Sequence, residues 1–370
     1  RANIARHTWA RKAAEAMAAQ ASWWLDKSDD YICSLIPGEN PRAVCPSFEK
    51  GCPIHGGARN SFVASMEKPY RWKCLAGGEE WFDGAVVKNP GTGADVTVRD
   101  DGSGFLAPEG FPNAGRRYYF TAAYRYFILG KLFGAPYEGD AGGGYSGNTA
   151  ALHLALAYAY TGDARFAHKA AVMLNRLADV YRFMDGCIEG PSQRQDGYIG
   201  QTFERFWVQH IALACDLVWD EVMKDEALAA FFAARGATDY DGDGRVTPKD
   251  IAHNLQRNLL GYIYEYVHRL MPYLDGDFLI YEMGALGAVA AALGNGDLVR
   301  EMLEGDYGLR FLLSTEFFRD GKFIYDSSGY NTGNAMEVAT LAEYLHGFRD
   351  ERVYKEPLDL YNDPRYRMGE

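Results

Sequence analysis

The chain has 370 residues, of which 48% are hydrophobic and 24% are charged, a composition typical of a globular protein with a large core. Its formal net charge of −12 argues against nucleic acid or an anionic membrane surface as a partner. No apolar run approaches the length needed to span a bilayer, so we expect no membrane insertion. Aromatic residues make up 14% of the chain, which suits both a carbohydrate-binding cleft and a large helical core.

The N-terminal part of the chain has two patterns. Residues 2–25 have the apolar spacing of a helix, whereas residues 31–112 are rich in Gly and Pro and predict a mostly irregular segment. The chain begins at Arg1 rather than at a methionine, and its C-terminal residues carry no sign of a natural stop. We therefore expect it to be a piece of a longer protein.

From about residue 115 onward, nearly every apolar segment has a helical period. Gly162 and Asp163 separate two such segments, as a helix stop and an N-cap. No fixed repeat length is visible, and the connections are short. The pattern predicts an all-α fold over residues 1–350, an (α/α) toroid or incomplete barrel of helical hairpins. The expected helices are 116–133, 148–160, 163–183, 201–219, 250–270, 278–293, 297–303, 309–318 and 335–345.

Residues 236–252 contain a close match to the twelve-residue EF-hand calcium loop. Its carboxylates stand at positions 1, 3, 5 and 12, glycine stands at the sharp turn, and a backbone carbonyl is expected at position 7. A single loop favours a structural Ca²⁺ rather than a calcium sensor, and Asp at position 12 predicts weaker affinity than Glu would give. The alternative is an acidic turn that binds no ion. The predicted ligands are Asp239, Asp241, Asp243, Arg245 and Asp250.

Cysteine and histidine residues cluster in the irregular N-terminal segment. Cys52 and His55 have a spacing that can chelate a soft divalent ion, and Cys45 and Cys74 would complete a tetrahedral Zn²⁺ site. The spacing is not that of a standard zinc finger. A disulfide between two of the cysteines, or unlinked reduced thiols, are the alternatives.

Residues 320–334 place a tyrosine, hydroxyls and amides on a glycine-bearing loop directly before the last expected helix. Polar groups on such a loop are available to a ligand, and Tyr330 is a candidate for proton transfer. The alternative is a capped helix start with a surface tyrosine.

Several of these segments together resemble the heparinase II/III-like polysaccharide lyases. The resemblance is carried by Cys52-Pro-Ile-His-Gly56, Trp72-Lys-Cys74 with Gly77-Gly-Glu79, Arg117-Tyr-Tyr-Phe120, residues 204–216 and the loop from Asp320 to Tyr330. It implies an α/α toroid followed by a C-terminal β-sandwich, so residues 351–370 would begin the linker between them. It also implies β-elimination on a uronate-containing acidic polysaccharide, in the periplasm or outside the cell.

The resemblance also implies roles for individual residues. Tyr330 would transfer a proton, and Glu204 matches a position that is commonly acidic. Asp277 stands near the position where an Asn or His of the family faces the substrate carboxylate, and this departure is unfavourable because an ionised Asp repels a carboxylate. The candidate substrate-binding residues are Asn331, Tyr281, Arg117 and Arg125.

Two other functions fit the same residues. A glycoside hydrolase on an α/α barrel would need paired carboxylates, for which Asp277, Glu282 and Asp326 are candidates. A non-catalytic glycan-binding toroid is the third alternative. The sequence specifies neither the polysaccharide nor the oligomeric state.

Overall fold

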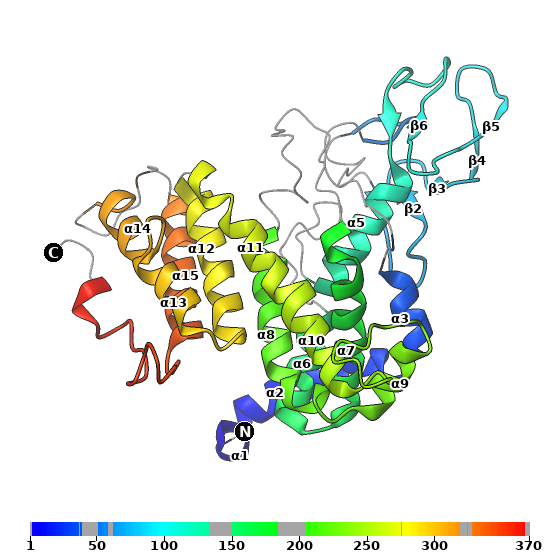
Figure 1. Ribbon diagram of the computed structural model, residues 1–370. Coiled ribbons are helices and arrows are strands. Elements are labelled where there is room, and N and C mark those ends of the chain that lie inside the picture. The colour runs from blue at the N-terminus through cyan, green and yellow to red at the C-terminus, as the bar shows by residue number, and fades with distance from the viewer. Residues whose placement is uncertain are drawn as a thin grey trace. The chain divides into compact units, whose positions relative to one another are not determined.

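The computed structural model describes residues 2–36, 38, 51–57, 62–133, 150–183, 204–274, 276–318, 324 and 328–366 (Figure 1). These residues are mostly helical, which confirms the all-α class, while the toroid stays a prediction. The chain divides into two compact units, one made of residues 1–26, 151–182 and 205–370, the other of residues 27–150 and 183–204. None of the described helices combines the length and apolarity that crossing a membrane requires.

The described part of the first unit is mainly helical. The N-cap predicted at Asp163 is confirmed, because its carboxylate accepts a 3.0 Å hydrogen bond from the backbone N–H of Arg165, and Gly162 has a φ of 78°. The helix expected over residues 2–25 is interrupted at His7, which has an extended backbone. The α-helices are α1 Ala2–Arg6, α2 Thr8–Ala21, α6 Ala150–Thr161, α7 Ala164–Val180, α8 Glu204–Val222, α9 Glu226–Ala233, α10 Pro248–Asn254, α11 Tyr262–His268, α12 Gly276–Ala292, α13 Gly296–Glu304, α14 Leu309–Thr315 and α15 Ser328–Leu345. The 3₁₀ turns are η1 Ser22–Trp24, η2 Tyr181–Phe183, η4 Met271–Tyr273 and η5 Pro364–Tyr366.

The helix expected over residues 250–270 is continuous but not uniform. Its middle, η3 Leu255–Gly261, is a π-helix between α10 and α11. A π-helix closes each hydrogen bond one residue later than an α-helix, so it turns the side chains that follow relative to those before it. Both α10 and η3 pack against α7, and α10 also packs against α9.

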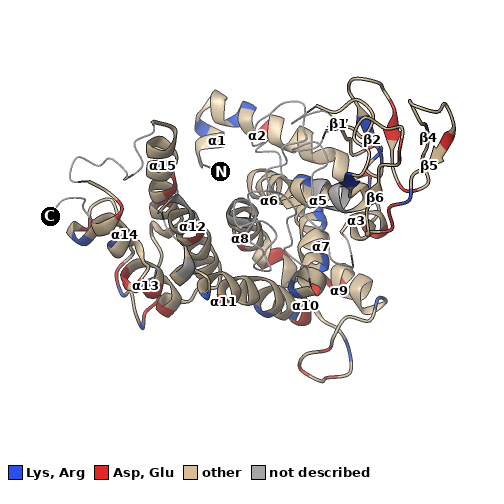
Figure 2. Cartoon of the chain, turned by 90° about the horizontal axis from the view of Figure 1, so that it is seen from above, with Lys and Arg blue, Asp and Glu red and all other residues tan. Residues whose placement is uncertain are grey.

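Helices α12 and α15 pack closely along their length. A Cβ atom built on Gly284 would approach Oε2 of Glu337 to 3.4 Å, and one on Gly287 would clash with Cδ1 of Leu341. Residue numbers therefore increase in the same direction along the facing sides of α12 and α15, so the two helices run parallel. Glycine at these two sites lets the backbones approach. Charged residues gather on α13, whereas the sequence of α12 carries only Asp277 and Glu282 (Figure 2).

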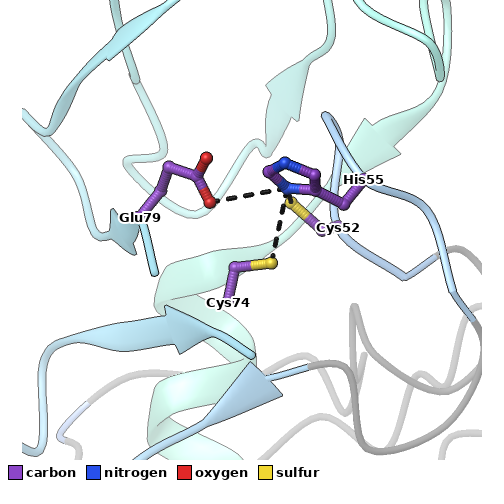
Figure 3. A group of neighbouring side chains, drawn as sticks. All are labelled: Cys52, His55, Cys74 and Glu79. Atoms are coloured by element: carbon purple, nitrogen blue, oxygen red, sulfur yellow. Dashed lines mark hydrogen bonds and ion pairs between the residues drawn. The ribbon is translucent and has the colours of Figure 1, made fainter. Parts of the chain in front are cut away.

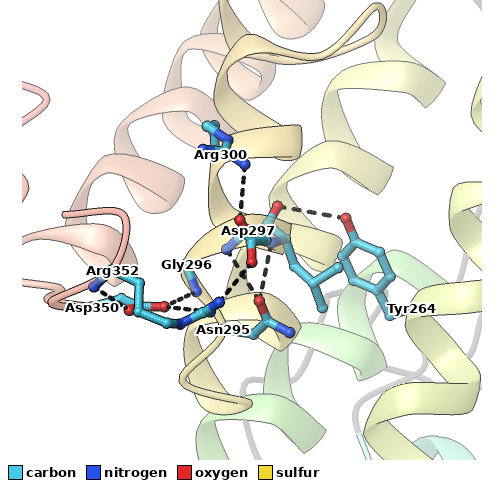
Figure 4. Close-up of polar contacts among 8 residues, drawn as sticks. Tyr264, Asn295, Gly296, Asp297, Arg300, Asp350 and Arg352 are labelled. Carbon is cyan, nitrogen blue, oxygen red and sulfur yellow. Dashed lines mark hydrogen bonds and ion pairs between the residues drawn. The ribbon is translucent and has the colours of Figure 1, made fainter.

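The residues after α15 are held against the helices of the same unit (Figure 4). Oδ2 of Asp350 accepts a hydrogen bond from the backbone N–H of Gly296, at the start of α13. Arg352 pairs with Asp297 at 3.2 Å and with Asp350 at 3.1 Å. Further along, Arg365 pairs with Glu304 at 3.3 Å.

The second unit contains helices and small antiparallel sheets. The helix expected from residue 116 begins only at Phe120, because Arg117 and Tyr118 pair as a strand with Leu106 and Phe105. The helices are α3 Asp29–Leu35 and α5 Phe120–Phe133. The strands are β1 Phe62–Val63, β2 Trp72–Cys74, β3 Glu80–Trp81, β4 Val86–Lys88, β5 Asp95–Thr97, β6 Phe105–Leu106 and β7 Arg117–Tyr118. They form sheets ordered β1-β2-β3, β4-β5 and β6-β7, so the segment predicted to be mostly irregular contains regular pairings.

An aromatic core joins these sheets to the start of α5. Phe120 stacks on Trp81 with ring centroids 5.2 Å apart and on Tyr118 at 6.0 Å, and it meets Phe62 edge-on. Trp72 lies edge-on to Phe62, and all five rings are buried. Such a core fixes β2 and β3, which carry part of the site described next.

Candidate metal centre

Two tight turns of the second unit bring four polar side chains together. In the first turn, Cys52 and Gly56 exchange backbone hydrogen bonds of 2.9 and 2.8 Å, and Gly56 adopts a φ of 65°. In the second turn, which joins β2 to β3, the N–H of Cys74 bonds the carbonyl of Glu79 at 2.8 Å, and the N–H of Gly78 bonds the carbonyl of Cys74. Each turn thus holds two side chains near one point.

The four side chains converge on a common centre (Figure 3). Nδ1 of His55 lies 3.7 Å from Sγ of Cys52, 3.6 Å from Sγ of Cys74 and 3.5 Å from Oε2 of Glu79. One ligand atom from each residue lies within 4.8 Å of all the others. Around a tetrahedral Zn²⁺ with its usual bond lengths, neighbouring ligand atoms stand about 3.3 to 3.8 Å apart. The three measured separations match that arrangement.

Burial and charge at this centre are suited to a cation. Both sulfur-bearing residues are fully buried, whereas the side chains of His55 and Glu79 are 33% and 28% exposed. Burial, reinforced by the neighbouring Cys74, raises the pKa of the Cys52 thiol to about 12. Oε2 of Glu79 is itself buried and accepts no hydrogen bond from the described residues. A divalent ion here would stabilise the thiolates and give that oxygen a partner.

Gly77 leaves the space that this centre occupies. A Cβ atom built at this position would clash with Cε1 of His55 and with both carboxylate oxygens of Glu79. Because no side chain projects from residue 77, the imidazole and the carboxylate can lie side by side.

Three of the four predicted ligands, Cys52, His55 and Cys74, come together, while Cys45 lies outside the described residues and stays a prediction. Glu79 lies with the three, although the sequence reasoning did not assign it as a ligand. The sequence feature that could have identified Glu79 is its short distance along the chain from Cys74, which allows a hairpin turn to bring the two residues together. Cys52 and Cys74 are free thiols, so neither takes part in a disulfide.

The calcium loop is formed in part as predicted. Carboxylate oxygens of Asp239, Asp241 and Asp243 lie within 4.8 Å of one another. Asp239 also accepts hydrogen bonds from two loop amides, of which the one from Gly244 is 2.8 Å long and is the main reason that the pKa of Asp239 is lowered. Gly244 has a φ of 92°, which a turn of this kind requires.

Asp250 stands apart from that carboxylate group. Its oxygens accept hydrogen bonds from the backbone N–H of Tyr240 and from both the N–H and the hydroxyl of Thr247, which form the capping box of α10. Arg245 directs its guanidinium toward Asp243 at 3.5 Å. Of the predicted ligands, the structure therefore groups three carboxylates and uses Asp250 to begin the helix.

Tyr330 and Asn331 lie in the first turns of α15, so the prediction that they belong to a loop before the helix was wrong. Gly and Asn disfavour helix interiors, but packing against α12 outweighs that local preference. Tyr330 is 48% exposed. A Cβ atom on Gly333, three residues further along, would lie 2.8 Å from the hydroxyl of Tyr281, so this face of α15 meets Tyr281.

The remaining candidates are less informative. Arg117 donates from Nη1 to the carbonyls of Ser103 and Gly104, and so holds a loop of the second unit. Glu282 is buried in α12. Residue 326 and the side chains of residues 125, 204 and 277 lie outside what the structure describes. Those predictions remain untested.

Comparison with known proteins adds no assignment: no family model matches the chain, and no curated protein matches it. The heparinase-like resemblance therefore rests on the motifs alone.

Proposed function

We propose that this chain is the helical part of a lyase that cleaves a uronate-containing acidic polysaccharide by β-elimination, with Tyr330 as its proton-transfer residue. The observation that carries the proposal is the placement of Tyr330, half-exposed at the start of α15 on a helix whose next turn meets Tyr281 of α12. Of the residues that the resemblance assigns to chemistry and to substrate binding, Tyr330, Asn331 and Tyr281 thus share one region of the first unit.

The chemistry needs three functions at that region. A base removes the proton beside the uronate carboxylate, and an acid protonates the departing glycosidic oxygen. The carboxylate must also be neutralised as negative charge develops in the transition state. Tyr330 supplies a phenol for proton transfer, and Asn331 supplies an amide that can donate to the carboxylate. An ionised Asp277 would oppose this neutralisation.

The toroid is part of the same proposal. In a ring of helical hairpins, alternate helices run in the same direction. Helices α12 and α15 pack side by side, as neighbouring helices of such a ring would. We place the enzyme in the periplasm or outside the cell, where polymeric substrates and millimolar calcium are present.

Two structural metal ions complete the proposal. Cys52, His55, Cys74 and Glu79 would hold Zn²⁺ as a closed set of four protein ligands, which leaves no open position for catalysis. Its role would be to join the two turns. Ca²⁺ would bind the carboxylates of Asp239, Asp241 and Asp243 in the loop before α10. Asp250 would stabilise the closed loop through the hydrogen bonds that it accepts at the start of that helix.

The test is product analysis with the full-length protein that contains this chain. It is incubated with alginate, polygalacturonate, hyaluronan and heparan sulfate in calcium buffer, while ultraviolet absorbance follows the new C4–C5 double bond. We expect absorbance to rise on at least one substrate and Tyr330→Phe to abolish the rise. Tyr361→Phe is the matched control, because Tyr361 is 55% exposed in the same unit. Reducing ends that appear without absorbance would indicate hydrolysis and overturn the lyase proposal.

A further inference from the structure

A polar cavity of about 270 Å³ opens in the first unit where α7, α9, α10 and η3 meet. All of its lining residues belong to that unit. Its floor contains Asn175, which is fully buried, and Asn254, which is 6% exposed. Asp179 and Tyr240 stand at its exposed rim. No residue of this cavity belongs to the site of Cys52, His55, Cys74 and Glu79 or to the region around Tyr330, whereas Tyr240 and Asp250 are shared with the calcium loop.

Hydrogen bonds fix the orientation of the floor amides. Nδ2 of Asn254 donates to Oδ1 of Asn175 at 3.0 Å and to Oδ1 of Asp179 at 2.9 Å. Oδ1 of Asn254 accepts from the hydroxyl of Tyr240 at 3.2 Å and from Nδ2 of Asn258 at 2.8 Å. Turning the Asn254 amide over would set its oxygen against a carboxylate, so its orientation is determined by its neighbours.

This orientation leaves one buried donor unused. Because Oδ1 of Asn175 faces Asn254, its Nδ2 faces elsewhere, and that nitrogen is buried with no hydrogen-bond partner among the described residues. A buried amide N–H without an acceptor is unfavourable, and native proteins rarely keep one without a reason. Asn175 is one of the residues that line the cavity.

The rest of the lining alternates donors and acceptors. Asp179 presents a carboxylate, while Thr238 and Tyr240 present hydroxyls. Asn258 presents an amide from the π-helix, and π-helical turns occur frequently at functional sites. The lining also contains the guanidiniums of Arg182 and Arg235, which equal its carboxylates, Asp179 and Asp250, in number, so its formal charges cancel. A hydroxyl group both donates and accepts, so a neutral ring bearing several hydroxyls matches such a lining.

We propose that this cavity is a binding site for a single neutral sugar unit, with a sugar oxygen accepting from Nδ2 of Asn175 and sugar hydroxyls donating to Asp179. The cavity volume of about 270 Å³ is enough for one hexose ring. The inference does not depend on the lyase proposal, because it concerns binding by other residues.

Binding is tested by saturation-transfer NMR and calorimetry on the whole chain, with D-glucose, D-galactose, D-mannose and D-xylose as probes. D-Glucuronate and inorganic phosphate serve as anionic probes. We expect saturable binding of at least one neutral sugar, weakened at least tenfold by Asp179→Ala and by Asn175→Ala. Gln256→Ala is the matched control, because it removes an exposed amide on the same π-helix that does not line the cavity.

Each result decides the proposal. Asp179 lies at the rim, so its variant keeps the test valid if Asn175→Ala fails to fold. The proposal is overturned if no neutral sugar binds, if only the anionic probes bind, or if Asp179→Ala binds as tightly as the unaltered chain. Tyr330→Phe should leave sugar binding unchanged, which separates this outcome from the fate of the lyase proposal.

Discussion

The backbone N–H of Gly296 donates a 2.9 Å hydrogen bond to Oδ2 of Asp350, a residue 54 positions further along the chain. Asp350 also accepts from Arg352, and its pKa is lowered chiefly by a backbone hydrogen bond from Arg352. A Cβ atom at residue 296 would come within 2.6 Å of the same carboxylate oxygen, so only glycine permits this contact. The segment after α15 is therefore attached to the start of α13.

Asp350→Ala should loosen that attachment. Removing the carboxylate leaves the Gly296 N–H and the Arg352 guanidinium without this acceptor, so the segment 351–366 opens more often. We expect limited proteolysis to cleave within it several-fold faster, with little change in the far-ultraviolet circular dichroism. Asp306→Ala, an exposed acidic residue after α13, is the control. Equal cleavage of the two variants would contradict the anchoring role.

Cys74→Ser should remove the zinc ion. We expect about one zinc per chain in the unaltered protein and almost none in the variant, as measured by mass spectrometry of the metal content. Zinc at 100 times its dissociation constant would add about 2.7 kcal/mol to the free energy of unfolding, and a chelator should remove that gain. Cys33→Ala, at another buried free cysteine of the same unit, should keep its zinc. Equal zinc in all three proteins would contradict the site.

Gly77→Ala tests the same centre without touching a ligand. The added methyl group would displace the His55 ring or the Glu79 carboxylate, since both stand where Cβ would be. We expect zinc affinity to fall by about tenfold or more, because a displaced ligand weakens tetrahedral coordination. Competition with a chromogenic chelator measures this affinity. Unchanged affinity would show that the two side chains do not both bind the ion.

Asp239→Asn should abolish calcium-dependent stabilisation. The variant keeps the size of the side chain but removes a charge from the group with Asp241 and Asp243. Thermal unfolding in calcium and in chelator should differ for the unaltered chain and coincide for the variant. Asp306→Asn makes the same charge change elsewhere and should leave the calcium effect intact. If calcium never shifts the unfolding temperature, the loop binds no ion.

Asp225 predicts a pH dependence of stability. Burial alone would raise its pKa, but hydrogen bonds from His168, at 2.6 Å, and from the N–H of Leu228 outweigh it, so the pKa is lowered. The resulting stabilisation is present above the pKa of the unfolded chain and is lost as pH falls through the folded pKa. Asp225→Asn, which keeps an N-cap side chain, should cost about 2 kcal/mol near pH 6 and less at a pH below 3.8, the ordinary value for an aspartate. Urea unfolding at both pH values measures the difference, and a constant difference would contradict the assignment.

Local signals in the sequence predicted much of the fold. Asp163 and Gly162 marked a helix boundary correctly because capping depends on neighbouring residues alone. The π-helix at Leu255–Gly261 was not predicted, because no local pattern marks it and its packing partner α7 is distant in the sequence. Tyr330 was placed on a loop for the same reason: its Gly- and Asn-rich surroundings suggest a turn, and the contact with α12 that makes them helical is distant in sequence.

The metal centre, too, could be predicted from the sequence only in part. Cys52, His55 and Cys74 were identified by residue type and spacing, which are visible in the sequence. Glu79 was missed as a ligand because carboxylates are common, and only the hairpin that returns it beside Cys74 distinguishes it from other acidic residues. The sugar cavity had no sequence signal, since its amides come from helices far apart in the chain.

The parallel packing of α12 and α15 has an electrostatic consequence. Two helices that run in the same direction present their N-terminal ends on the same side, here at Gly276 and Ser328. Each end carries a partial positive charge of the helix dipole, worth about 0.3 to 1 kcal/mol for a nearby anion. The protein as a whole carries a net charge of −12, yet at this end the backbone itself favours a negative ligand.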